Sequence, residues 1–352
     1  MAAKKVMLWP STRSKFVKDK HMEILYRSLL LVALVMVVET YFMYSFMYAI
    51  KLALMVLVSI VLTIEMEILF YTHDKDVDRQ KAKELIVKSY PKLTAIIYAL
   101  LIPIGTPLWL VGLGAVLATL LGKLIFGGFA HQVFHSSLVG VIFVTLGWTQ
   151  LVDSVAFMTS FDNYILELMF DNAFFNNNLS LGGMYDPADL TSALGMLAGG
   201  DAYDFHLVFL GLAPGITGAG FVLVGLFAYY LVKGIVNWIT PTITIASFLV
   251  VALIATAVNG ETAMYPLQQL FSGAFLFVVV FVVTDPITTP IPTIGKIIFG
   301  VVAGALTMTI RLAGTYEEGV LFAVLFMNML TPLLNEVFKQ KKKPVKKAVA
   351  KA

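Results

Sequence analysis

Residues 186–194 read Asp186-Pro187-Ala188-Asp189-Leu190-Thr191-Ser192-Ala193-Leu194, and they lie at the centre of a polar segment, residues 151–205, that divides the chain. This segment carries eight carboxylates and neither Lys nor Arg, whereas apolar stretches fill most of the sequence on either side. Carboxylates are costly in hydrocarbon, so the segment cannot be a membrane span. The expected membrane spans therefore lie on either side of it.

The composition indicates a membrane protein. The chain has 352 residues, 59% of them hydrophobic and 13% charged, and a water-soluble protein of this composition would have too little polar surface to cover its core. It has no cysteine, which excludes disulfides and thiolate-held iron–sulfur clusters within the chain. No nucleophile–base set, phosphate loop or dinucleotide fingerprint is present, so we predict no catalytic residue and no nucleic-acid partner.

Apolar windows recur along the chain, each long enough to cross roughly 30 Å of hydrocarbon. Several are interrupted by proline, which removes a backbone donor and restricts the preceding residue. The first follows a basic N-terminus but lacks a small-residue cleavage site, so we interpret it as a retained span. The sequence predicts an all-α integral membrane protein with about ten transmembrane helices. The expected spans are 24–44, 52–71, 93–110, 112–126, 132–151, 206–232, 235–258, 266–284, 294–310 and 318–338.

Positive charge predicts the orientation. Both ends of the chain and the connector 72–92 are basic, and with ten spans these three regions share a face, which the positive-inside rule places in the cytoplasm. Of the 25 Lys and Arg residues, Lys51 and Arg311 are the ones that fall away from this face, while Lys123 is counted near it. The predicted parts are a cytoplasmic basic N-terminus (1–22), a first five-helix half (23–150), the acidic extracytoplasmic segment (151–205), a second five-helix half (206–338) and a basic cytoplasmic tail (339–352).

The two halves share a weak sequence similarity. Pro103-Ile104-Gly105-Thr106-Pro107, before the fourth span, resembles Thr288-Thr289-Pro290-Ile291-Pro292, before the ninth. Because each half has an odd number of spans, such a repeat is inverted in the membrane. Inverted repeats place binding sites near the midplane at interrupted helices.

Histidines and carboxylates in the first half each have two interpretations. His131 and His135 are four residues apart and can share a helix face, either as a metal pair or as polar groups at a helix entrance. Glu39, Glu65 and Glu67 lie within or near the ends of the first two spans, where a carboxylate indicates a role in ion passage. Glu65 and Glu67, however, fall near the cytoplasmic end of their span and can also reach water.

Polar residues near the last two spans are also ambiguous. Asn328 and Asn335, seven residues apart, are expected to pack or hydrogen-bond within the bundle. Arg311 is the best cation near the outer end of the ninth span for a phosphate group, but it can equally pair with Glu317 and Glu318.

From the eighth span onward the sequence resembles the D subunit of Rnf complexes and, more distantly, the B subunit of sodium-pumping NADH:quinone reductases. The resemblance extends over nearly the whole chain. It rests on Leu270-Phe271-Ser272-Gly273-Ala274-Phe275, Thr284-Asp285-Pro286-Ile287-Thr288-Thr289-Pro290-Ile291-Pro292, Gly295-Lys296, Gly304, Arg311, Gly314, Glu318-Gly319-Val320, Phe322-Ala323, Asn328 and Pro332, with earlier matches at Gly122-Lys123, Gly127-Gly128, Pro214-Gly215-Ile216-Thr217-Gly218 and Trp238.

The resemblance implies a subunit of a redox pump in a bacterial or archaeal cell (inner) membrane. Such a complex couples electron transfer between reduced ferredoxin and NAD⁺ to Na⁺ or H⁺ translocation. Its D subunit has ten spans in two inverted halves, like urea transporters, and is not catalytic alone. It carries FMN, held by a phosphoester to an extracytoplasmic threonine, and works beside iron–sulfur and flavin-bearing subunits. The candidate cofactor-binding residues here are Thr191, Ser192, Thr217 and Arg311.

The sequence departs from the family pattern at the flavin position. The family motif reads Asp-x-x-Ser/Thr-x-Ala-Thr, and here Leu194 stands in place of the acceptor threonine and Ala188 in place of the aspartate. Leucine has no oxygen and cannot form the phosphoester. Three alternatives follow: attachment at Thr191 or Ser192 after a register shift, FMN or riboflavin bound without a covalent bond, or loss of this flavin. The stretch Ala130–His135 also differs from the family's glycine–asparagine pattern, which makes a second, noncovalent flavin there doubtful.

The sequence thus predicts a D-type subunit of an Rnf-type complex, acting as a flavin-linked electron carrier or coupling subunit. A secondary transporter or channel with the same inverted-repeat fold and no redox role is the alternative. A purely structural subunit is the third interpretation.

Overall fold

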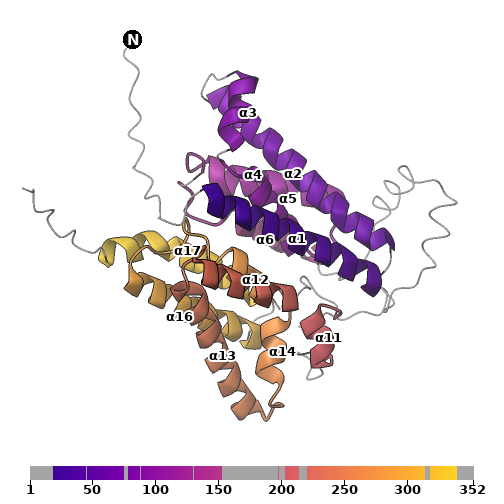
Figure 1. Ribbon diagram of the computed structural model, residues 1–352, viewed down its shortest axis with the longest axis vertical. Coiled ribbons are helices and arrows are strands. Elements are labelled where there is room, and N and C mark those ends of the chain that lie inside the picture. Colours follow the sequence, from indigo (N-terminus) through magenta and orange to yellow (C-terminus); the bar gives the residue numbers. More distant parts are fainter. Residues whose placement is uncertain are drawn as a thin grey trace, which may run out of the picture.

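The structure, a computed structural model, describes residues 19–44, 46–74, 78–87, 89–129, 131–152, 197, 203–213, 220–313 and 318–338. Every element in this part of the chain is helical (Figure 1). Five of these helices are long and apolar enough to cross a membrane, and four shorter apolar helices accompany them. The prediction of an all-α, multi-pass membrane protein is confirmed. The count of ten spans and the sides on which the termini lie stay predictions.

Prolines determine where several helices of the N-terminal part begin and end. Residues 102–107 are not helical, since Pro103 and Pro107 cannot donate the backbone hydrogen bonds that a continuous helix needs. Pro91 stands in the first turn of its helix, a position that needs no such donor. The elements are α1 (Asp19–Met43), α2 (Phe46–Asp74), α3 (Arg79–Val87), α4 (Pro91–Leu101), α5 (Leu108–Thr119), the π-helical turn η1 (Leu120–Leu124), α6 (Ser136–Gly147) and α7 (Thr149–Val152).

The C-terminal part repeats the alternation of long and short helices. Gly273, with φ 66°, separates two short helices, and the proline-rich residues 284–292 separate the second of these from the next long helix. A positive φ is a conformation that glycine adopts without strain. The elements are α11 (Phe205–Leu210), α12 (Gly220–Lys233), α13 (Ile239–Asn259), α14 (Tyr265–Phe271), α15 (Phe275–Phe281), α16 (Thr293–Ala313) and α17 (Gly319–Val337).

The two parts pack in similar ways. The long helix α2 contacts α3, α4 and α5, and α5 contacts α6; correspondingly, α13 contacts α14, α15 and α16, and α16 contacts α17. Figure 1 shows the N-terminal helices (indigo to magenta) and the C-terminal helices (red to yellow) as two adjoining groups. The groups meet where α1 contacts α12 and where α6 contacts α17.

The short helices form the interior of the bundle. All seven residues of α15 are buried, and so are most of those in α4. Longer helices surround them and expose large apolar side chains such as Leu34, Leu57 and Ile254. A helix that is apolar all round belongs in the centre of a membrane bundle, and apolar side chains on the outside face lipid.

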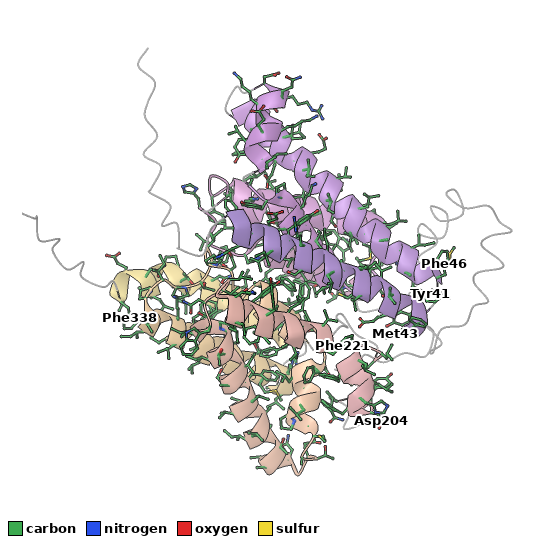
Figure 2. All side chains as sticks on the ribbon, in the orientation of Figure 1. Tyr41, Met43, Phe46, Asp204, Phe221 and Phe338 are labelled. Atoms are coloured by element: carbon green, nitrogen blue, oxygen red, sulfur yellow. The ribbon has the colours of Figure 1, made fainter. Side chains whose placement is uncertain are left out.

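The labelled residues show on which side of the molecule three points of the chain lie. In Figure 2, Met43 and Phe46, at the turn from α1 into α2, lie on the same side of the molecule as Asp204, the residue before α11. Phe338, which follows α17, lies on the opposite side. The predicted topology requires this arrangement of these points.

Several predicted boundaries were wrong. The expected span 52–71 begins earlier, because α2 starts at Phe46, and Lys51 therefore lies inside a helix with none of its surface exposed, not in an outer loop. The expected span 266–284 is two helices, α14 and α15. The span expected over residues 93–110, with a break at Pro103, Gly105 and Pro107, ends as a helix at Leu101, and α5 begins at Leu108, so the break is confirmed.

We expect Gly304→Ala to destabilise the protein through the contact of α13 with α16. A Cβ atom at Gly304 would lie 2.9 Å from the backbone nitrogen of Phe248 and closer still to the carbonyl oxygen of Thr244. Because backbone atoms cannot move aside cheaply, the free energy of unfolding should fall by about 1–3 kcal/mol. The measurement is helicity against denaturing detergent for the purified protein.

Gly225→Ala is the matched control. Gly225 lies in α12, and a Cβ atom there would meet nothing within 4 Å. Alanine has the higher helix propensity, so this variant should unfold at or above the wild-type midpoint. Equal destabilisation by both substitutions would show that close packing at Gly304 is unimportant.

Candidate functional site

Polar groups inside the bundle gather where helices are interrupted, beginning with the proline-rich break between α15 and α16. Asp285 accepts hydrogen bonds from the backbone nitrogen of Ile287 at 3.2 Å and from the hydroxyl of Thr288 at 2.9 Å. The hydroxyl of Thr289 donates to the carbonyl oxygen of Asp285 at 2.5 Å. Aspartate and threonine side chains commonly close such turns. The Thr-Asp-Pro motif thus builds a rigid, non-helical turn within the bundle.

Asn328 of α17 joins this turn to the N-terminal part. With the amide oriented to satisfy both of its groups, its nitrogen donates to the carbonyl oxygen of Thr288 at 3.2 Å and its oxygen accepts from the backbone nitrogen of His135 at 3.1 Å. Thr331 donates to the same carbonyl at 3.0 Å, and Asn335 accepts from the nitrogen of Ile291 at 2.8 Å. The prediction that Asn328 and Asn335 hydrogen-bond within the bundle is confirmed.

A cavity of about 40 Å³ lies beside this bridge, between the two parts. Gln132, His135, Thr284 and Asp285 line it together with aromatic and apolar side chains. The ring nitrogen Nδ1 of His135 is buried and has no hydrogen-bond partner among the described residues. A polar cavity above roughly 15 Å³ is large enough for a water molecule. The site can therefore hold water between His135 and the Thr-Asp-Pro turn.

The two histidines lie at the entrance to α6, where His135 is the residue before the helix. No group of three His, Cys, Asp or Glu side chains in the described residues could hold a metal ion. Nδ1 of His131 lies 3.2 Å from the carbonyl oxygen of Phe129, and the carbonyl of His135 accepts backbone hydrogen bonds from the first turn of α6. This geometry favours the alternative of polar groups at a helix entrance.

Arg311 of α16 hydrogen-bonds to the main chain at the break between α14 and α15. Its guanidinium donates to the carbonyl oxygen of Gln269 at 2.5 Å and to that of Ser272 at 3.1 Å, and its side chain is 2% exposed. Glu318, 3.9 Å away, accepts a hydrogen bond from the backbone nitrogen of Ala274 with each carboxylate oxygen at 3.0 Å. The cation thus caps the end of one helix and the anion the start of the next, as their dipoles favour.

Lys123 likewise hydrogen-bonds to the main chain at a helix break, in the N-terminal part. It lies in η1 and donates to the carbonyl oxygen of Ser89 at 2.7 Å, at the break between α3 and α4. It also forms an ion pair with Glu67 of α2 at 2.6 Å, and both side chains are buried (1% and 0% exposed). The alternative that Glu67 reaches water was wrong, because its side chain is buried, whereas the placement of Lys123 near the cytoplasmic side stays a prediction. Glu65 does reach the surface, where it pairs with Arg79 at 2.9 Å.

The two cations occupy corresponding places. Each lies near the C-terminal end of the helix that follows a proline-rich break, and each donates to the carbonyl of a serine, Ser89 or Ser272. Each serine precedes a residue with positive φ, Tyr90 at 52° and Gly273 at 66°. Lys51 adds a third buried cation, 3.3 Å from the carbonyl oxygen of Gly105 in the break before α5. Buried cations at interrupted helices are thus a repeated feature of this bundle.

The sequence alternative that Arg311 pairs with Glu318 is confirmed, whereas the pair of Lys123 with Glu67 was not predicted. A signal was available, since Glu67 and Lys123 are intramembrane charges of opposite sign, which usually pair. Of the predicted cofactor-binding residues, Arg311 is engaged by main-chain carbonyls and by Glu318. Thr191, Ser192, Leu194 and Thr217 lie outside the described residues.

The helices and their buried polar contacts define a polytopic α-helical membrane protein with interrupted helices inside the bundle. A family model described as the NQR2, RnfD, RnfE family matches residues 13–343. The chain belongs to this family, and the resemblance inferred from the last three spans is confirmed.

Three relatives show the range of the similarity. The D subunit of the ion-translocating oxidoreductase complex of Actinobacillus succinogenes is 29% identical over 265 residues, covering 69% of this chain and 74% of the relative. The protein of the same name from Mannheimia succiniciproducens is 28% identical over 281 residues, covering 73% and 78%. The B subunit of the Na⁺-translocating NADH-quinone reductase of Chromohalobacter salexigens is 28% identical over 255 residues, covering 70% of this chain and 58% of the relative.

We expect the Lys123–Glu67 pair to be strongly coupled. Lys123→Met leaves a buried carboxylate without its cation and should lower the free energy of unfolding by about 3–5 kcal/mol. Lys123→Met combined with Glu67→Leu should recover much of this loss, because an apolar pair can replace a buried ion pair. The measurement is a double-mutant cycle of unfolding in denaturing detergent.

The surface pair Arg79–Glu65 is the control for this cycle. Its side chains are 63% and 45% exposed, and Arg79→Ala should change the stability by about 1 kcal/mol or less. Additive losses at Lys123 and Glu67 would contradict the coupling.

Proposed function

We propose that this chain is the D-type membrane subunit of an Rnf-type complex. The complex couples electron transfer between reduced ferredoxin and NAD⁺ to Na⁺ or H⁺ translocation in a bacterial or archaeal cell (inner) membrane. Within it the chain acts as a flavin-linked electron carrier or coupling subunit. It is not catalytic alone.

The observation that carries this proposal is the family match over residues 13–343. The match includes both helix-rich parts, so the similarity is not limited to one shared motif. Relatives in the family are named as the D subunit of ion-translocating oxidoreductase complexes and as the B subunit of Na⁺-translocating NADH-quinone reductase. Both names describe membrane subunits of redox-driven ion pumps.

We further infer that the two parts are inverted halves of five spans each, with both termini in the cytoplasm. The matching contacts of α2 and α13 support this inference, as do the matching serine carbonyls bound by Lys123 and Arg311. The basic ends of the chain support the orientation. An inverted repeat of this kind brings interrupted helices together near the membrane midplane, where coupling ions bind in other transporters.

FMN is the proposed cofactor, and riboflavin is the alternative. A flavin supplies the one- and two-electron chemistry, and the protein supplies its position and potential. Leu194 has no oxygen for a phosphoester, so the candidate attachment residues are Thr191 and Ser192, or the flavin is held without a covalent bond. The cavity beside His135, at about 40 Å³, is far below the roughly 300 Å³ of the smaller ligand pockets and does not fit a flavin in this conformation.

Other subunits must bind ferredoxin and NAD⁺. The chain has no cysteine for cluster ligands and no dinucleotide-binding fingerprint. The proposed partners are therefore iron–sulfur and flavin-bearing subunits of the same complex, in addition to Na⁺ or H⁺ and the lipid bilayer. The acidic segment 151–205 is the surface that we propose for a flavin-bearing partner outside the cytoplasm.

Leu194 favours a second candidate function. A secondary transporter or channel with the same inverted-repeat fold would need no flavin acceptor, and a purely structural subunit would need none either. Either protein would carry no flavin, and the transporter would also purify alone. The redox subunit should instead purify with iron–sulfur proteins.

The test is a flavin assay on the complex purified through a tag on this chain. We expect iron–sulfur subunits to co-purify and flavin to remain with this chain, either as in-gel fluorescence and a modified peptide within 185–205, or as flavin that acid releases. A chain that purifies alone and without flavin would overturn the proposal. Flavin that acid releases counts only if it is lost when this chain is removed.

A gain-of-function variant sharpens this test. Ala188→Asp combined with Leu194→Thr restores the family's acceptor pattern and should produce covalent FMN in cells that make the flavin-transferring enzyme. Ala188→Asp combined with Leu194→Val is the matched control, because valine has a similar shape but no hydroxyl. The expected readout is fluorescence of the denatured chain with the first variant and none with the control.

A further inference from the structure

An apolar groove of about 310 Å³ opens between the start of α1, α2, α3 and the start of α4. Met22, Tyr26, Ile64, Ile86 and Leu93 line its apolar part. Lys83 of α3 and Lys92 of α4 also line the groove, and both side chains are exposed. The groove therefore combines an apolar interior with two cations from different helices.

The two lysines are available to a ligand. Among the described residues, neither Lys83 nor Lys92 forms an ion pair. Glu23, which also lines the groove, pairs with Arg27 at 2.5 Å. The nearby Arg79 is paired with Glu65 at 2.9 Å. The unpaired charge that remains at the groove is thus positive and suits an anionic group.

The groove lies at the level where lipid headgroups are expected. The 29 residues of α2 extend about 43 Å at 1.5 Å per residue, more than the roughly 30 Å of hydrocarbon that a span must cross. Figure 1 shows α3 at the far end of α2. In α3 the residues Ala82 and Ile86 are buried while its charged residues are exposed, which is typical of a helix at the membrane surface.

We propose that this groove binds an anionic phospholipid, with the phosphate group at Lys83 and Lys92 and an acyl chain against the apolar lining. The groove is charged at its rim and apolar in its interior. A phospholipid has the matching order, a charged headgroup followed by apolar acyl chains. Basic pockets at the headgroup level between membrane helices suit anionic headgroups, whereas the phosphate of a zwitterionic lipid is partly neutralised by its own cation. The proposal does not depend on the redox role of the chain.

The first test is native mass spectrometry of the delipidated protein, with its co-purifying subunits, titrated with phosphatidylglycerol or phosphatidylcholine. We expect one phosphatidylglycerol molecule to bind in clear preference to phosphatidylcholine. Lys83→Gln combined with Lys92→Gln should weaken this preference about tenfold or more, since each lysine near an anionic headgroup contributes on the order of 1 kcal/mol.

Lys81→Gln combined with Lys233→Gln is the matched control, because both lysines are exposed and neither lines the groove. This control should keep the wild-type preference. An equal loss in both double variants would mean that net charge matters and the groove does not. A wild-type protein without preference for phosphatidylglycerol would also overturn the proposal.

A second test identifies the occupant directly. A photoreactive amino acid at Val87, which lines the groove and is exposed, would be activated in membranes that contain the assembled protein. A cross-link to phospholipid is the expected result. A cross-link to a peptide from residues 1–18 of this chain, or to another protein of the complex, would overturn the proposal and identify a protein occupant.

Discussion

The fold depends on satisfying main-chain carbonyls where helices break within the bundle. Hydrocarbon offers no water, so each freed backbone group needs a partner from the protein. Here buried cations provide the donors: Lys51 binds the carbonyl of Gly105, Lys123 that of Ser89, and Arg311 those of Gln269 and Ser272. Carboxylates compensate two of these cations: the buried Glu67 pairs with Lys123, and the partly exposed Glu318 pairs with Arg311. Without these contacts the short helices inside the bundle would leave costly unpaired groups.

This arrangement keeps interrupted helices rigid. The Thr-Asp-Pro turn is closed by its own side chains, and Asn328 joins it to His135 across the boundary between the two parts. A polar, water-sized cavity lies beside that bridge, in an otherwise apolar interior. Breaks of this kind are the places where membrane bundles expose backbone and polar groups to ions. The structure therefore places hydrogen-bonding groups and a small cavity at the boundary between the two parts.

The family membership and the departure at Leu194 bear on different aspects of function. Membership rests on motifs that the structure places at helix breaks, Ser272-Gly273-Ala274 and Thr284–Pro292, which preserve the architecture. The proposed flavin-attachment residues, Thr191 and Ser192, belong instead to the acidic segment 151–205. The fold alone therefore does not decide between electron carrier and transporter.

The sequence by itself determined the class of protein. Recurring apolar windows predicted a multi-pass helical bundle, prolines at 103, 107 and 290 predicted breaks, and the motifs of the last three spans predicted the family. Only the tertiary structure decided which charged side chains are buried and which groups they contact. The sequence pattern places Lys51 in the loop between the first two spans, because a charge normally seeks water, and it allows Glu67 to reach water. Only the folded bundle brings Lys51 to a carbonyl 54 positions away and Lys123 to one 34 positions away, and pairs Lys123 with Glu67, 56 positions away. These contacts make burial of the cations favourable. The pattern of residues along the chain shows which positions are polar. Which distant polar groups pair with one another depends on how the helices pack.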